Sequence, residues 1–201
     1  LSEGCPAPQP WRADTAYQPV YQWPDLAQDA VLLRALHDFI TLGYLLVHHT
    51  PTQPDAILGI ARRFGFVRET NFGAYFVVYS RPAAEAIDLA YQPVALGPHT
   101  DNPYRTPVPG IQLLQCLQNQ TSGGLSSLVD SLAVAAQVRQ EDPEGFALLS
   151  RIPLRFEHRD ATTQLVAIKP MIEHDGSGQM VGVHYSPRLD SLPLMSEDDT
   201  R

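Results

Sequence analysis

The fold and the chemistry of this chain are organised around Leu96-Gly97-Pro98-His99-Thr100-Asp101-Asn102-Pro103-Tyr104. In extended backbone, side chains at positions i and i+2 leave the same face. We therefore expect His99 and Asp101 to point one way and Thr100 the other. An imidazole and a carboxylate on one face supply two ligands of a 2-His-1-carboxylate triad, which leaves three coordination positions open and suits non-heme Fe(II). A His-x-Asp triplet also occurs by chance, so its neighbours decide whether it marks a metal site.

Four further motifs surround this triplet in a fixed order. They are GFVRETNFG (65–73), Leu-Ala-Tyr (89–91), PGIQLLQC (109–116) and GGLSSLVD (123–130). In this order and spacing the five motifs resemble the γ-butyrobetaine hydroxylase branch of the Fe(II)- and 2-oxoglutarate-dependent dioxygenases, the branch related to taurine dioxygenase. The resemblance runs from about Trp11 to Tyr185. Five motifs in sequence order are far more specific than His-x-Asp alone.

Aromatic residues gather between Phe66 and Tyr91. Aromatic faces carry negative potential, so several arranged as a box bind a quaternary ammonium group. By residue pattern alone, these aromatics are more simply the core side of a strand. The resemblance implies instead that Phe72, Phe76 and Tyr91 belong to a trimethylammonium cage. It therefore implies a small quaternary ammonium substrate.

The open metal positions leave room for a cosubstrate. Three protein ligands leave room on Fe(II) for a chelating 2-keto acid and O2. The resemblance implies that 2-oxoglutarate is this acid and that Ser126 places a hydroxyl against it, with a serine bonded to neighbouring backbone as the alternative. Asn102 and Tyr104 follow the ligands closely. They are candidates for orienting the ligands and contacting the substrate, or are simply loop residues.

The chain departs from the family pattern after Asp101. No later residue matches the distal iron histidine or the arginine that binds 2-oxoglutarate, and His184 is the one conceivable substitute for that histidine. The resemblance places both residues beyond Arg201. We therefore expect these 201 residues to bind iron weakly or not at all. An N-terminal zinc-binding module before Leu1 is also allowed.

A second departure concerns the anionic end of the substrate. Asp88 and the pair Ser186-Pro187 stand where γ-butyrobetaine hydroxylases use asparagines. An aspartate facing a carboxylate is repulsive, whereas Arg188 can pair with an anion, preferably a tetrahedral one with several acceptors. Two substrates therefore remain open, namely γ-butyrobetaine and 2-(trimethylammonio)ethylphosphonate.

The element pattern predicts a mainly β fold with flanking helices. We expect an extended lead-in over 1–24 and one dioxygenase domain over 25–201. Helices are predicted after Asp25 as far as Gly43, and over 54–64, 131–140 and 142–150. Strands are predicted over 44–48, 74–79, 111–117, 125–130 and 154–159, with a hairpin over 171–185. This pattern indicates a jelly-roll barrel, the double-stranded β-helix, lacking its C-terminal strands in this chain.

Composition restricts the partners. The net charge of −8 argues against nucleic acid. No apolar run approaches the ~18 residues of a membrane span, and no signal pattern begins the chain, so a cytoplasmic protein is expected by default. Cys116 lies in an apolar run and is predicted to be a buried thiol. A homodimer is one of the open oligomeric states.

Two other classes of protein remain as alternatives. One is an inactive fragment or a non-catalytic barrel that binds a ligand without metal chemistry. The other is a zinc hydrolase using His99 and Asp101, but no motif supplies its general base.

Overall fold

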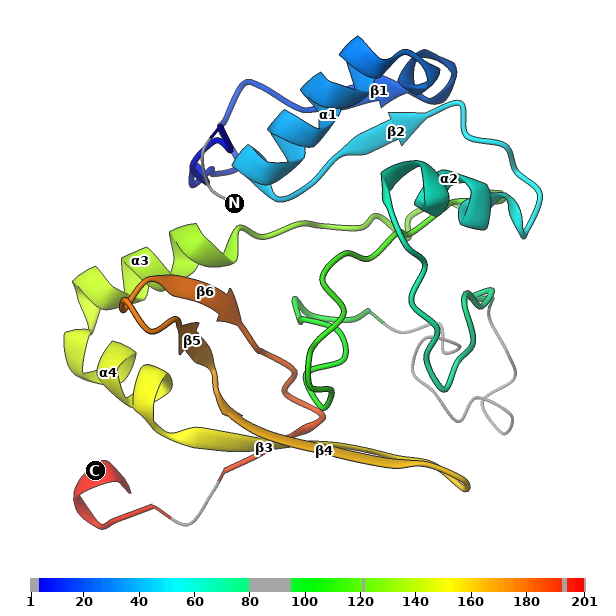
Figure 1. Cartoon of the computed structure of the whole chain (residues 1–201). Helices are drawn as coiled ribbons and strands as arrows, with labels where there is room; N and C mark the ends of the chain where they lie inside the picture. The colour runs from blue at the N-terminus through cyan, green and yellow to red at the C-terminus, as the bar shows by residue number, and fades with distance from the viewer. Residues whose placement is uncertain (1–3, 80–94, 121, 193–194, 201) are drawn as a thin grey trace.

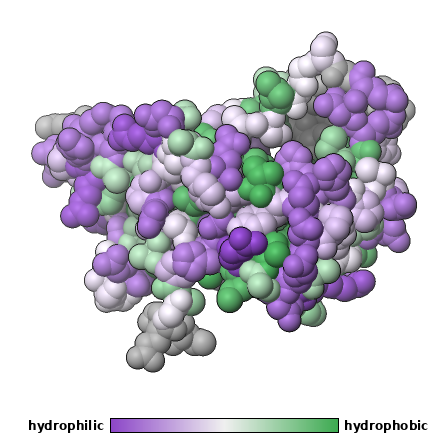
Figure 2. All heavy atoms as spheres, turned by 90° about the horizontal axis from the view of Figure 1, so that it is seen from above, coloured by the Kyte–Doolittle hydropathy of each residue, from purple (hydrophilic) through white to green (hydrophobic). Residues whose placement is uncertain are grey.

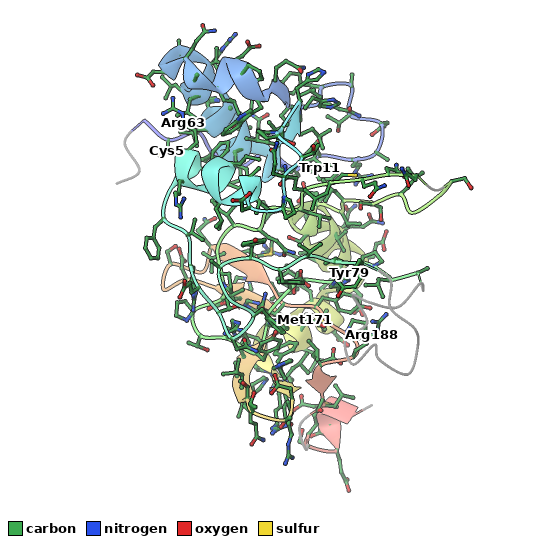
Figure 3. All side chains as sticks on the ribbon, turned by 90° about the vertical axis from the view of Figure 1, so that its right-hand side faces the viewer. Cys5, Trp11, Arg63, Tyr79, Met171 and Arg188 are labelled. Atoms are coloured by element: carbon green, nitrogen blue, oxygen red, sulfur yellow. The ribbon has the colours of Figure 1, made fainter. Side chains whose placement is uncertain are left out.

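The structure is a computed structural model that describes residues 4–79, 95–120, 122–192 and 195–200 (Figure 1). Its N-terminal part holds five elements. They are β1 (Val20–Gln22), the 3-10 helix η1 (Trp23–Ala27), α1 (Asp29–Leu42), β2 (Leu46–His48) and α2 (Ala56–Phe64). Strands β1 and β2 pair in parallel, with Val20 opposite Leu46. Trp11 and Arg63, labelled in Figure 3, hold this part together, since Trp11 Nε1 donates to Leu42 O (2.8 Å) and Arg63 Nε to Leu26 O (3.0 Å).

The first predicted helix is confirmed at its end and wrong at its start. Gly43 ends α1 in the left-handed conformation (φ 80°), and its N–H donates to Phe39 O, as a residue without Cβ allows. Asp25, the predicted cap, lies within η1, which has Pro24 in its first turn. Gln28 is extended between η1 and α1 (φ −83°, ψ 124°), so the chain leaves the 3-10 helix before α1 begins.

Helices α3 (Ser131–Glu141) and α4 (Pro143–Arg151) confirm the predictions for that region. Asp130 caps α3 by accepting from Leu132 N (2.8 Å). Asp142 caps α4 by accepting from Gly145 N (2.8 Å). Figure 1 shows both helices beside the hairpin of β5 (Ile172–His174) and β6 (Met180–Val183), which is itself confirmed.

A three-stranded antiparallel sheet lies below these elements in Figure 1. Its order is β4 (Gln164–Pro170), β3 (Pro153–Arg159) and β7 (Asp190–Ser191). Strand β4 was not predicted. The 3-10 helix η3 (Asp198–Thr200) follows near the end of the chain. Of the three sheets formed by the described residues, none closes into a barrel. No described helix has both the length and the apolar character needed to cross a bilayer.

Three strand predictions are wrong. Residues 74–79, 111–117 and 125–130 are irregular, and no described strand pairs with them. Strand propensity alone does not make a strand, because the backbone N–H and C=O groups need a paired neighbour. Their apolar side chains remain open to solvent, and Leu114 and Leu125 are 76% and 97% exposed. Cys116 is also exposed, so the prediction of a buried thiol is wrong. Figure 2 shows such apolar side chains among hydrophilic ones on the molecular surface.

The buried core fixes the segment that opened the sequence analysis. Tyr104, Leu154 and Phe156 form one cluster, and Met171 and Leu189 pack against it. Tyr104 is 6% exposed and is the residue through which the segment enters this core. The segment is therefore anchored against β3 even though it is not a strand.

Candidate active site

His99 and Asp101 are brought together as the i, i+2 spacing predicted. His99 Nε2 lies 3.3 Å from Asp101 Oδ1, and His99 Nδ1 lies 2.8 Å from Gly97 O. A carbonyl oxygen only accepts, so His99 donates through Nδ1–H and leaves Nε2 directed at the carboxylate. In a neutral imidazole this nitrogen carries a lone pair. A metal ion bound between these two atoms would use both as ligands.

Thr100 points away from the pair and anchors it. Its backbone N–H donates to Tyr185 O (2.7 Å), and its Oγ1 accepts from Tyr185 N (2.9 Å). These bonds fix the backbone between His99 and Asp101, whose side chains are 36% and 42% exposed. The pair is thus held by the structure and open to a ligand.

The pair fits two ligands of an Fe(II) site, because imidazole nitrogen and carboxylate oxygen are donors that non-heme iron takes. The carbonyl that holds the second ring nitrogen is the outer contact that metal-binding histidines usually have. Among the described residues, no group of three His, Cys, Asp or Glu side chains forms a metal site. His184, the conceivable substitute ligand, is buried and bonded to Glu173 (2.7 Å).

Phe72 and Phe76 also lie together, with ring centroids 5.6 Å apart. A tight turn presents Phe72, since its backbone N–H donates to Thr70 Oγ1 (3.1 Å) and Gly73 has a φ of 86°. Tyr91, the third predicted cage residue, lies outside the described residues.

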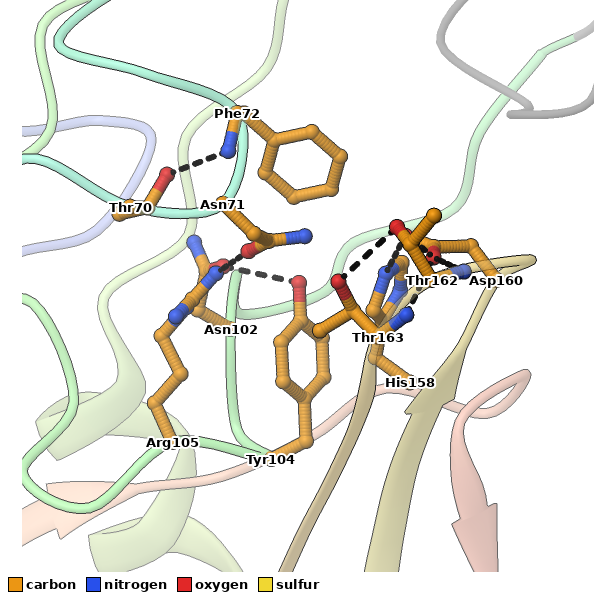
Figure 4. Close-up of polar contacts among 10 residues, drawn as sticks. All are labelled: Thr70, Asn71, Phe72, Asn102, Tyr104, Arg105, His158, Asp160, Thr162 and Thr163. Carbon is orange, nitrogen blue, oxygen red and sulfur yellow. Dashed lines mark hydrogen bonds and ion pairs between the residues drawn. The ribbon is translucent and has the colours of Figure 1, made fainter.

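His158 extends this aromatic pair (Figure 4). Its ring packs edge-on against Phe72 at 5.5 Å and stacks on Tyr104 at 5.0 Å between centroids. Asp160 Oδ2 lies 3.2 Å from His158 Nε2. The backbone N–H of Thr162, with the His158 contact next, lowers the pKa of Asp160 to about 2. We name the four rings Phe76, Phe72, His158 and Tyr104 the aromatic row.

A polar network joins the aromatic row to Asn102, the residue that follows Asp101 (Figure 4). Asn102 is left-handed (φ 56°), and its Oδ1 accepts from Tyr104 Oη (2.9 Å) and from Arg105 Nε (3.1 Å). Arg105 also donates to Asn71 Oδ1. Because Asn71 precedes Phe72 and Asn102 follows Asp101, the guanidinium of Arg105 connects the two halves of the site.

Other predicted site residues are not brought to this place. Ser126 is exposed in an irregular segment, and no hydrogen bond between described residues joins it to His99 or Asp101. Arg188, labelled in Figure 3, is exposed after β6 and takes part in none of the ion pairs found in the described ranges. Asp88 lies outside the described residues.

Sequence analysis missed His158 and Arg105. His158 had a usable signal, because it shares the alternating inward face of β3 with the buried Leu154 and Phe156. Arg105 follows the opening segment directly, but its contact with Asn71 spans 34 residues. No local pattern predicts such a contact.

Comparison with known proteins identifies the family. The family model described as "Taurine catabolism dioxygenase TauD, TfdA family" matches residues 6–200, so the chain belongs to this family. Among similar proteins is the gamma-butyrobetaine dioxygenase of Pseudomonas sp. (strain AK-1), 38% identical over 163 residues, which are 81% of this chain and 42% of that protein. The mitochondrial trimethyllysine dioxygenase of Rattus norvegicus is 33% identical over 145 residues, which are 70% of this chain and 34% of that protein.

These relatives confirm the resemblance to the γ-butyrobetaine hydroxylase branch. The chain spans less than half the length of each of the two.

Proposed function

We propose that this protein is an Fe(II)- and 2-oxoglutarate-dependent hydroxylase of a small trimethylammonium zwitterion such as γ-butyrobetaine. One observation carries the proposal: Asn102, the residue that follows the His99–Asp101 pair, is hydrogen-bonded to Arg105, and Arg105 is hydrogen-bonded to Asn71, which precedes Phe72 of the aromatic row. Family membership and the names of the relatives support the same class of reaction. With 2-oxoglutarate and O2, bound Fe(II) supplies the oxidation of a C–H bond to C–OH.

His99 and Asp101 hold the metal in this proposal. The Gly97 carbonyl keeps the His99 ring in the tautomer whose Nε2 can coordinate. The hydrogen bonds of Thr100 keep both ligands on one side of the backbone. Ser126 remains the proposed contact of 2-oxoglutarate.

Phe72 and Phe76, at one end of the aromatic row, bind the trimethylammonium group. Methylated nitrogen has no N–H to donate, so its recognition depends on ring faces and on shape. Phe76 is 50% exposed and is therefore accessible to a ligand. Tyr91 is proposed to complete the cage, and Asp88 and Arg188 stay proposed contacts of the polar part of the substrate. We further propose that the three small sheets belong to a jelly-roll barrel.

The test is turnover by the full-length protein supplied with Fe(II), 2-oxoglutarate and O2. We expect succinate to form with γ-butyrobetaine. The analogue 5,5-dimethylhexanoate, in which an uncharged carbon replaces the quaternary nitrogen, should give far less. Equal succinate formation from both compounds would refute the cation cage.

The metal assignment is tested by His99→Ala and Asp101→Ala. Each should abolish hydroxylation and weaken Fe(II) binding, measured by metal content after gel filtration. His48→Ala, which removes an exposed histidine elsewhere, is the matched control. If full-length wild-type protein binds no Fe(II), the protein is instead a non-catalytic binding barrel.

A phosphonate substrate is the second candidate. Three cations contact the loop after the metal pair: Arg105 through Asn102, Lys169 through Arg105 O (2.9 Å) and Arg68 through Pro107 O (3.0 Å). Such a positive region favours a dianion over a monoanion. A higher kcat/KM for 2-(trimethylammonio)ethylphosphonate than for γ-butyrobetaine would select this candidate.

A further inference from the structure

We infer that Arg105 is the residue that binds the anionic end of the substrate, a carboxylate or a phosphonate. The inference rests on the proposed function, and it adds a specificity-determining residue that the sequence pattern did not indicate. Three observations support it: the contacts that fix the Arg105 guanidinium, the absence of a carboxylate partner among the described residues, and the position of Arg105 next to the aromatic row.

The guanidinium of Arg105 is held on three sides. Asn102 Oδ1 accepts from Nε (3.1 Å), Asn71 Oδ1 accepts from Nη2, and the ring centroid of Tyr104 lies 5.4 Å from Cζ. Tyr104 is buried and is itself bonded to Asn102. A guanidinium fixed in this way loses little conformational freedom when it binds a ligand.

Arg105 has no carboxylate partner among the described residues. Each ion pair in that part of the chain involves other residues. Within the described ranges, both hydrogen bonds of the side chain go to neutral amide oxygens, which do not compensate its positive charge. An arginine has five N–H donors, and these two bonds leave three for a ligand. A planar group with free N–H donors matches a carboxylate or a phosphonate in two-point geometry.

The position of Arg105 suits a zwitterion. Asn71, one of its two hydrogen-bond acceptors, precedes Phe72 of the aromatic row. The cation-binding rings and the anion-binding guanidinium are therefore neighbours, while Asn102 on the other side follows the proposed ligand Asp101. A substrate with opposite charges at its two ends would span from the aromatic row to Arg105, which follows the proposed ligand Asp101 by four residues.

Lys169 reinforces this positive region from β4. Its ammonium donates to Arg105 O (2.9 Å), and burial, partly opposed by Glu173, lowers the pKa of Lys169. In a chain of net charge −8, a local group of cations is what an incoming anion requires. Arg188, by contrast, is exposed and has no contact among the described residues that would orient it.

The experiment measures binding to the full-length Fe(II)-loaded protein by calorimetry. The probes are γ-butyrobetaine, 2-(trimethylammonio)ethylphosphonate and choline, which has the same cationic head and no anionic group. Arg105→Met keeps an apolar stem over Tyr104 and removes the charge. We expect it to weaken binding of both zwitterions by roughly 10- to 100-fold while leaving choline binding unchanged.

Further variants separate a binding role from a structural one. Arg105→Lys should give an intermediate loss for the zwitterions, since it keeps the charge and loses the fork. Arg62→Ala, an exposed arginine on α2, is the matched control and should behave as wild type.

Three outcomes would overturn the inference. In the first, Arg105→Met weakens choline as much as the zwitterions. In the second, it raises the KM for 2-oxoglutarate alone, which would assign Arg105 to the cosubstrate. In the third, Arg188→Ala and not Arg105→Met weakens the zwitterions. If the proposed function itself is wrong, the wild-type protein will bind neither choline nor the zwitterions, and this result distinguishes that failure from the three outcomes above.

Discussion

Asn102 has two structural roles, one through its backbone and one through its side chain. Its backbone is left-handed, a conformation that asparagine tolerates better than most residues. Its side-chain oxygen accepts from the buried Tyr104 and from Arg105 at the same time. The residue after Asp101 therefore fixes both the direction of the chain and the guanidinium that we propose as the anion site.

We predict that Asn102→Ala lowers the free energy of unfolding by about 2 kcal/mol, because it loses both bonds and strains the backbone. Asn102→Gly removes the strain and should cost less, and Asn102→Asp keeps the accepting oxygen and should cost least. Urea denaturation of the full-length protein gives the three values. An equal loss in all three variants would contradict the double role.

Asp160 makes stability depend on pH in acid solution. The pKa of Asp160 is lowered to about 2, first by the backbone N–H of Thr162 and next by His158. A depressed carboxyl pKa stabilises the fold above the unfolded value of about 3.9, and this contribution is lost as the pH falls through the folded value. We predict that wild-type stability falls more steeply than that of Asp160→Asn between about pH 4 and pH 2.

Chemical denaturation at several pH values measures this difference. Asp14→Asn, which changes an exposed aspartate of the lead-in, is the control. Parallel slopes for wild type and Asp160→Asn would show that the turn bonds of Asp160 do not form in solution.

At the scale of elements, helices α3 and α4 are both capped by an aspartate, but only one of the two aspartates also bonds to a distant segment. Asp142 accepts one bond, from Gly145 N. Asp130 caps α3 and also accepts from Trp11 N (2.7 Å), 119 residues away. Asp130 thereby fastens the lead-in to a helix from the middle of the chain.

We predict that Asp142→Ala costs about 1 kcal/mol of stability, the usual value of a lost cap. Asp130→Ala should cost roughly 1 kcal/mol more, because the bond to Trp11 is lost as well. Limited proteolysis should also release the lead-in faster from Asp130→Ala than from Asp142→Ala. Identical cleavage rates would show that Trp11 is held by other contacts.

The elements also show how far the sequence could predict the structure. Helices α3 and α4 and the β5–β6 hairpin were predicted because caps and turns are local signals. Strands over 111–117 and 125–130 were expected from composition, but the described residues provide no partner strand for them. The spacing of His99 and Asp101 is equally local, and so it was predictable. The contacts of Arg105 with Asn71 and of His158 with Phe72 join distant segments and were not predictable.

At the scale of the whole molecule, the exposed area is large for the mass. The chain of 22.2 kDa exposes 14544 Å², against about 9400 Å² for a folded monomer of that mass. Much of this surface is apolar, with Phe66, Leu114 and Leu125 each at least three-quarters exposed. Surface of this kind favours association with other apolar surfaces.

We predict that a polypeptide of these 201 residues alone binds the dye ANS and forms soluble aggregates, seen by fluorescence and light scattering. Leu114→Ser combined with Leu125→Ser should reduce both signals, since it removes two of the most exposed apolar side chains. A monomer that binds no dye would contradict the prediction.

The hydrogen bonds of Thr100 indicate when the His99–Asp101 pair becomes fixed during synthesis on the ribosome. Its anchoring partner, Tyr185, is 85 residues further along the chain. While a nascent chain is emerging, the imidazole and the carboxylate on either side of Thr100 are therefore unfastened until translation has passed that tyrosine. Loading of a metal ion would accordingly follow the synthesis of residue 185, and a ribosome stalled before that residue would display a peptide without a formed chelate.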